Sequence, residues 1–135
     1  MQTFLPYPNF SDTAKTLDNK RLGKQRVEAW QIYQIVSGKR TTGGWVNHPA
    51  VKMWRNYPDA LAHYHNEMID EWVSRGFKNN MPLIYHNPRY QRPPWASDSK
   101  FLESHQANLL RKDASFYGQY GWQVDPELPY VWPIA

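Results

Sequence analysis

The ionisable side chains best placed to move protons or bind anions lie in one short stretch, residues 17–30. A helix of about 3.6 residues per turn would place Arg21, Lys24 and Glu28 on one side of this stretch and a set of apolar residues beside them. Glu28 would then lie where a basic stripe meets the buried face. A carboxylate there is either an ordinary i,i+4 partner of Lys24 or a proton-handling group inside an anion-binding site.

Other reactive side chains are few. The chain has no cysteine, which excludes disulfides, thiolate zinc sites and thiol nucleophiles. His63 and His65 would face away from each other on a helix, so the five histidines do not form a metal set. His65 and His105 lie on apolar stripes, where hydrogen-bonded core residues are expected. His48 precedes a proline. It is expected either to cap a turn or to act at the site, by binding a phosphate or by transferring a proton.

Charge is distributed unevenly along the chain. Residues 1–56 hold nine Lys and Arg against three acids, and residues 57–135 hold seven against nine, which gives the net charge of +4. Such a distribution indicates an oriented anion-binding face, for which nucleic acid is the usual large anion. The alternative is a lysine-rich helix that is only solvated.

The elements that must position these residues are predicted to be helices of one compact domain, residues 1–135. The composition, 41% hydrophobic with seven Trp, nine Tyr and five Phe, is sufficient for a core. No stretch approaches the roughly 20 apolar residues of a membrane span, and the first residues do not resemble a signal peptide. We therefore expect a cytoplasmic protein that does not associate with membranes.

The predicted fold is all-α, with three main helices, long irregular loops and an extended N-terminal arm. Pro6 and Pro8 exclude a helix from the arm. The first helix is expected to run to about Ser37, the second from Pro58 to Gly76, and a short turn to cover residues 48–54. Caps are expected at Asn9, Ser11 or Asp12 for the first helix and at Ser97 or Asp98 for the third, which Gly118 and Gly121 would end. A glycine inside the first helix, Gly23, indicates local weakness or a close neighbour.

The long segment 76–96 interleaves cations with aromatic residues, including Arg89, Arg92 and Trp95. This composition suits contacts with DNA and stacking on unpaired bases. It is equally consistent with a segment that covers the core.

Several stretches, in this order along the chain, resemble the pyrimidine-dimer DNA glycosylase family: residues 17–28, 37–40, 71–77, 104–109 and 116–122. The founding member of that family is a small phage endonuclease that cuts DNA at ultraviolet photoproducts. The arm and the helix around Arg21 are similar to those of a bacterial and viral branch.

The resemblance implies a DNA glycosylase with AP-lyase activity that needs no cofactor. In the family an N-terminal α-amine attacks C1′ of the damaged nucleotide, expels the base and forms an imine, through which β-elimination cuts the strand. The corresponding residues here are Met1, which the bulky Gln2 should protect from removal, and Glu28 as the essential acid. Peptide α-amines have pKa values of about 7.7–8.0, so part of such a population is nucleophilic near pH 7.

The expected DNA contacts follow the same resemblance. They are Lys20, Arg21, Lys24 and Arg26 on the first helix, with Gln31 beside them, and Tyr117 and Tyr120 in an aromatic stretch that either contacts the lesion or covers the core. Val27 and Arg21 replace an arginine and a histidine of the founding enzyme. These differences concern which lesion is recognised, a pyrimidine dimer or a similar damaged pyrimidine.

The expected partner is double-stranded DNA with a lesion or an abasic site, bound by a monomer. One alternative is a non-catalytic binder of damaged or single-stranded nucleic acid. Another is a hydrolase that releases a modified base without an imine.

Overall fold

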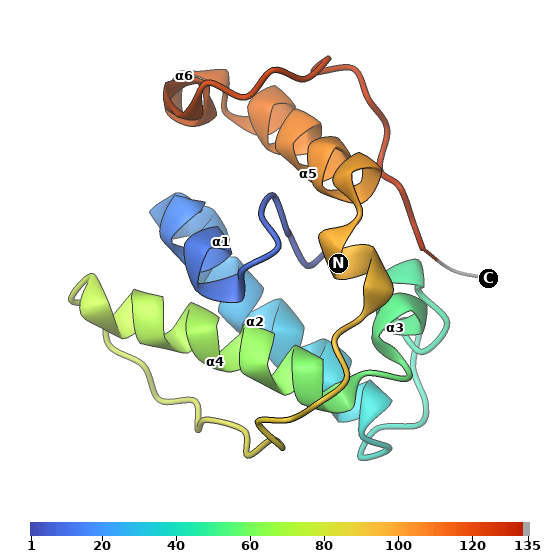
Figure 1. Cartoon of the computed structure of the whole chain (residues 1–135). Coiled ribbons are helices and arrows are strands. Elements are labelled where there is room, and N and C mark those ends of the chain that lie inside the picture. Colours follow the sequence, from blue (N-terminus) through green and yellow to red (C-terminus); the bar gives the residue numbers. More distant parts are fainter. Residues whose placement is uncertain (134–135) are drawn as a thin grey trace.

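The computed structural model describes residues 1–133, and every regular element in this part of the chain is a helix (Figure 1). The α-helices are α1 (Phe10–Thr16), α2 (Asn19–Val36), α3 (Pro49–Trp54), α4 (Pro58–Ser74), α5 (Ser99–Lys112) and α6 (Ala114–Tyr117), and the 3-10 turns are η1 (Pro94–Ser97) and η2 (Gly118–Tyr120). The all-α prediction is confirmed. Within residues 1–133, no helix has both the length and the apolar character needed to cross a membrane.

Helices α2 and α4 form the most extensive helix–helix contact. On α2 the buried side chains recur every three or four residues, at Leu22, Gln25, Ala29, Ile32 and Ile35, which is the pattern of one helical face. α4 begins at a proline in its first turn, as predicted, and buries its own stripe against α2. Because this face of α2 is fixed, Glu28 is held at its edge.

The prediction of one continuous helix up to Ser37 is wrong, because the chain breaks into α1 and α2 at Leu17. Leu17 is extended (φ −72°, ψ 141°) and fully buried. The break is held from the far end of the chain: the hydroxyl of Tyr117 accepts from the backbone N–H of Asp18 at 3.1 Å and donates to its carboxylate, and the hydroxyl of Tyr120 donates to the carbonyl of Thr16. Asn9 caps α1, as one of the predicted alternatives had it.

The third main helix also differs from its prediction, because α5 ends at Lys112 before either predicted glycine. Asp113 leaves the helical conformation (φ −155°, ψ 82°) and its side chain caps the short α6. At the other end, Asp98 caps α5 by accepting from the N–H of Lys100. Lys112, in the last turn of α5, lines the pocket described below.

The N-terminal arm runs through the middle of the molecule between α2 and α5 (Figure 1). It forms no regular element, so side chains of the surrounding helices satisfy its backbone groups. The N–H of Leu5 donates to Nδ1 of His105 at 2.9 Å, and the carbonyl of Pro6 accepts from Gln106. The side chain of Thr3 accepts from the indole of Trp54 at 2.9 Å. This last contact lies two residues from Met1 and anchors the start of the chain inside the fold.

Candidate active site

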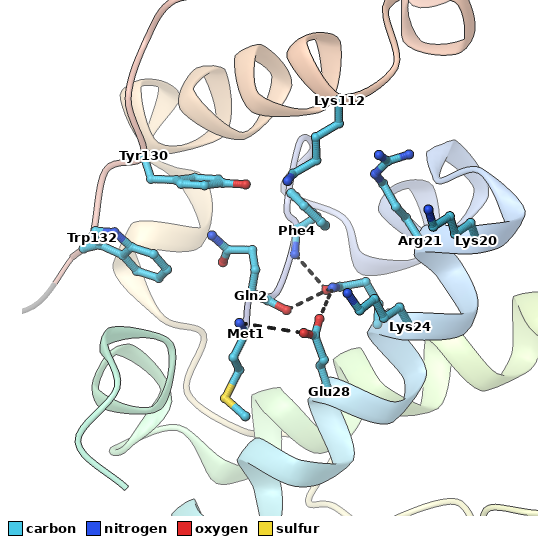
Figure 2. A pocket seen from close by; sticks show the side chains of 11 residues that line it. Met1, Gln2, Phe4, Lys20, Arg21, Lys24, Glu28, Lys112, Tyr130 and Trp132 are labelled. Carbon is cyan, nitrogen blue, oxygen red and sulfur yellow. Dashed lines mark hydrogen bonds and ion pairs between the residues drawn. The ribbon is translucent and has the colours of Figure 1, made fainter. Parts of the chain in front are cut away.

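A pocket of about 420 Å³ lies between the arm, α2, the end of α5 and the C-terminal segment (Figure 2). It is lined by Met1, Gln2, Phe4, Lys20, Arg21, Lys24, Gln25, Glu28, Lys112, Tyr130 and Trp132. Residues from both ends of the chain therefore share one cavity with the polar face of α2.

The amine of Met1 lies 3.8 Å from Oε1 of Glu28 at the floor of this pocket. The Met1 side chain is only 3% exposed and packs against the core, so it anchors the amine beside the carboxylate. The Glu28 side chain is 16% exposed. The two groups that the sequence paired as nucleophile and acid are therefore adjacent, although they are separated by a whole helix along the chain.

The electrostatic surroundings of Glu28 favour a proton-handling role. Burial raises its pKa above the ordinary value, while the Met1 amine, Lys24 and hydrogen bonds from Gln2 and Gln25 oppose this rise. Among the described residues, Lys24 forms no ion pair with Glu28; the cationic group in pairing distance is the amine. Of the two alternatives, the geometry favours the group inside a site over the ordinary i,i+4 pair.

A cationic rim surrounds the mouth of the pocket. Lys20, Arg21 and Lys24 project from α2, and Lys112 reaches in from the last turn of α5 (Figure 2). Arg21 is held in place by Asp18, with 3.3 Å between its Nη1 and Oδ1 of the aspartate. Cations on two sides of a concave site raise the local concentration of an anionic ligand such as a phosphate backbone.

An aromatic wall, Tyr130 and Trp132, closes the pocket on the side of Met1 (Figure 2). The two rings lie 5.7 Å apart, and Trp132 meets the ring of His48 edge-on at 5.9 Å. The backbone N–H of Val131, between them, donates to the hydroxyl of Ser104 on α5 at 3.2 Å. This contact ties the C-terminal segment to α5 and sets the position of the wall.

His48 caps α3, because its Nδ1 accepts from the N–H of Ala50 at 3.0 Å. Burial and the nearby Met1 amine lower its pKa. The structure thus gives His48 the turn-capping role, at a place behind the aromatic wall. His65 and His105 are fully buried in the core, as expected.

Two of the predicted DNA contacts on the first helix lie outside the pocket. Arg26 is directed toward α4: its guanidinium lies 5.0 Å from the ring centre of Trp72, and its Nη1 donates to Asn79 at 2.7 Å. Gln31 is exposed and does not line the cavity. Arg26 therefore stabilises the packing of α2 on α4 and does not belong to the cationic rim.

The loop residues divide in the same way. Trp95 is 9% exposed and meets Trp54 edge-on at 4.8 Å, so it cannot offer its face to a base. Arg92 donates to the carbonyls of Pro8 and Ala96, which fastens the loop to the arm. For Trp95 the core-covering alternative is correct, whereas Arg92 and Arg89 are exposed on the loop and do not line the pocket.

Tyr117 and Tyr120 also belong to the scaffold. Tyr117 is fully buried, and burial raises its pKa well above the ordinary value. Its ring stacks on Trp122 with 5.9 Å between ring centres. The suggested lesion contact by Tyr117 is therefore wrong, and both hydroxyls hold the break between α1 and α2.

Six pocket residues were not among the predicted site residues: Gln2, Phe4, Gln25, Lys112, Tyr130 and Trp132. Gln25 carried a usable signal, because it lies three residues before Glu28 and so shares its side of the helix. Lys112 lies in the last turn of α5, which the predicted helix overran. The C-terminal segment has no periodicity, so nothing local indicated its two aromatic residues. Among the described residues, no cluster of His, Asp and Glu side chains could hold a metal ion.

A comparison with protein-family models matches residues 1–85 to pyrimidine dimer DNA glycosylases. The chain belongs to the pyrimidine dimer DNA glycosylase family. Membership implies DNA glycosylase activity and binding of DNA that carries pyrimidine dimers. The comparisons with curated proteins and with solved structures gave no significant match. The matched residues include Met1 and Glu28, whereas Lys112, Tyr130 and Trp132 lie beyond them; assignment to a bacterial and viral branch stays a prediction.

Proposed function

We propose that the protein excises a damaged pyrimidine from DNA by way of the Met1 amine and then cuts the strand as an AP lyase. The observation that best supports this proposal is the amine 3.8 Å from a largely buried glutamate in a cationic pocket. An amine can act in this way without a metal or cofactor.

In the proposed reaction, the amine nitrogen bonds to C1′ of the damaged nucleotide. The bond from C1′ to the base breaks, and the base leaves with its electron pair. Opening of the sugar gives an imine between Met1 and C1′. Loss of a C2′ proton and departure of the 3′ phosphate then cut the strand. Glu28, as a carboxylate, stabilises the cationic sugar and carries the protons of ring opening and elimination.

The two sides of the pocket suit different parts of a nucleotide. In the proposed complex, the rim residues Lys20, Arg21, Lys24 and Lys112, which line the pocket, hold the phosphates on either side of the reacting sugar. The aromatic wall of Tyr130 and Trp132 offers a surface against which an extruded base can stack. A damaged pair costs less to open than an intact one, which supplies selectivity without reading the sequence.

The test incubates the protein with ultraviolet-irradiated, abasic and undamaged duplexes in the presence of EDTA. We expect cleavage of the first two, and borohydride should trap a covalent adduct that peptide mapping assigns to Met1. Glu28→Gln should abolish cleavage and largely preserve binding. Glu103→Gln, at an exposed position on α5 outside the pocket, is the matched control and should cleave normally.

Four results would contradict all or part of the proposal. An adduct on Lys20, Lys24 or Lys112 would show that the α-amine of Met1 is not the nucleophile. Salt-dependent binding without any cleavage would indicate a non-catalytic binder. Release of a base without a trappable imine would indicate a hydrolase. Cleavage of the abasic duplex alone would retain the lyase step and reject the pyrimidine-dimer substrate.

A further inference from the structure

Gln25 lies beneath the pocket, one helical turn before Glu28, and its amide makes four hydrogen bonds. Its Nε2 donates to the carbonyl of Gln2 and to Oε2 of Glu28, each at 2.9 Å. Its Oε1 accepts from the N–H of Phe4 at 2.9 Å and from the hydroxyl of Tyr64 at 2.8 Å. A side-chain amide has two N–H donors and two acceptor lone pairs, so Gln25 uses its full capacity.

These neighbours allow only one orientation of the amide. If its two terminal atoms were exchanged, the NH₂ group would face the N–H of Phe4, and the oxygen would face the carbonyl of Gln2 and the carboxylate of Glu28. A buried donor would then meet a donor, and a buried acceptor would meet two acceptors, which is strongly unfavourable. Gln25 is 1% exposed, so water cannot replace the lost partners. The side chain therefore presents an N–H to Glu28.

We propose that Gln25 is a positioning residue of the glycosylase reaction, which holds Glu28 and the first residues of the chain in the register that brings the amine to the carboxylate. This inference rests on the function proposed above. Because Gln25 is buried, it acts through Glu28 and not by contact with DNA. The same amide fixes both partners, since it binds Glu28 on one side and the backbone of Gln2 and Phe4 on the other.

Tyr64 secures this arrangement from α4. Its fully buried hydroxyl lies 2.7 Å from the carbonyl of Phe4 and 2.8 Å from Oε1 of Gln25, and these two acceptors share its single proton. Burial, with the charge of Glu28 as the smaller cause, raises the pKa of Tyr64 well above its ordinary value, so the phenol remains a donor. Tyr64 and Gln25 thus form a neutral hydrogen-bonded chain that links α4 to the carboxylate of Glu28.

Loss of the Gln25 donor has a definite sign for Glu28. A hydrogen bond to the charged form lowers a carboxyl pKa, so its removal leaves burial less opposed and raises the pKa of Glu28 further. The other charged or titratable groups around the carboxylate remain in place; they are the Met1 amine, Lys20, Arg21, Lys24, Lys112, Tyr64 and Tyr130. A smaller fraction of Glu28 is then ionised at a given pH.

The experiment compares Gln25→Met and Gln25→Glu with a matched control, Gln106→Met. Methionine keeps the size of Gln25 and removes all four hydrogen bonds. Glutamate keeps acceptors for Phe4 and Tyr64 and faces Glu28 with a second carboxyl group. Gln106 also anchors the arm, by donating to Pro6 at 2.9 Å, but it does not line the pocket. The control therefore loosens the arm without touching Glu28.

Both Gln25 variants should lower kcat on abasic DNA about ten- to a hundredfold, with KM nearly unchanged. The acid limb of their pH–rate profiles should move to higher pH. A carbon NMR titration of the Glu28 carboxyl should show the same direction. Gln106→Met should change neither kcat nor the acid limb, whatever its thermal stability.

If Gln25→Met shows the same Glu28 titration and the same kcat as the Gln106→Met control, the inference is overturned, and Gln25 contributes only to packing. If circular dichroism shows that Gln25→Met does not fold, Gln25→Glu decides, and an unchanged Glu28 titration in that variant overturns the inference. The NMR titration needs no activity. A wild-type protein that cleaves neither duplex would therefore refute the proposed function separately, while the effect of Gln25 on Glu28 is still measured.

Discussion

Gly23 lies inside α2 where the indole of Trp72 from α4 reaches the helix backbone. A Cβ at this position would lie 2.8 Å from Cζ3 and 2.9 Å from Cη2 of the indole, well inside the roughly 3.5–4.0 Å of favourable carbon contacts. The indole is itself held, because its Nε1 donates to the carbonyl of Lys78 at 2.9 Å and its ring stacks on Phe77 at 4.2 Å. Gly23→Ala therefore forces a fixed ring to move.

The two opposing effects have known sizes. In a free helix interior alanine is favoured over glycine by about 1 kcal/mol, and forcing extra volume into a packed site costs about 1–3 kcal/mol. Gly23→Ala should therefore change the free energy of unfolding by between roughly zero and a loss of 2 kcal/mol. Urea unfolding followed by circular dichroism measures this difference.

The control is the same substitution in a Trp72→Ala background. There the obstacle is absent, and Gly23→Ala should stabilise by about 1 kcal/mol relative to Trp72→Ala alone. A stabilisation of about 1 kcal/mol in both backgrounds would refute the reasoning, because it would mean that the indole yields at no cost.

Three further predictions concern the pocket and the core. Lys112→Ala should weaken binding of all duplexes about equally and reduce the slope of log affinity against log salt by about one in fluorescence anisotropy, whereas Lys100→Ala, at the exposed start of α5, should change the slope less. Trp132→Ala should cost about 1–3 kcal/mol in affinity for a duplex with an extruded base and little for an intact one; Trp45→Ala, which removes a 46% exposed indole outside the pocket, should cost neither duplex much. Burial lowers the pKa of His105 to about 3, so the unfolded chain binds more protons than the folded one below its ordinary value of 6.5. The stability that His105 contributes is present above pH 6.5 and is lost by about 1.4 kcal/mol for each pH unit below it, until the pH nears 3. Urea unfolding at pH 7, 6 and 5 should show a flatter dependence for His105→Asn than for the wild type.

The sequence predicted best what local patterns determine. Helices α2, α4 and α5 have apolar stripes at helical spacing, and the caps at Asn9 and Asp98 follow from residue type. The placement of Glu28 at the boundary of two faces follows from the same geometry, because it depends only on the turn of one helix.

The features that the sequence did not predict depend on contacts between residues that are distant in the chain. The break at Leu17 is held by the hydroxyl of Tyr117, which is 99 residues from its partner Asp18. A mixture of cations and aromatic residues does not show which side of a loop faces the core, so the sequence left DNA contact and core cover equally open for Trp95. The aromatic wall requires the C-terminal segment to return to the arm, which no local pattern records.

The aromatic wall and the anchored arm bring residues from both parts of the chain to one cavity, while α2 and α4 pack on each other without the C-terminal segment. The segment is held by ring contacts of Tyr130 with His105 and of Trp132 with His48, by one hydrogen bond from Val131 to Ser104, and by contacts from Arg111 and Asn108 to Leu128. On gradual warming, the C-terminal segment should detach before the helices unfold. Recognition of damaged DNA would then disappear at a temperature where far-ultraviolet ellipticity is still intact. Heat inactivation would therefore measure the loss of contact between the C-terminal segment and the N-terminal arm, and not the unfolding of the helices.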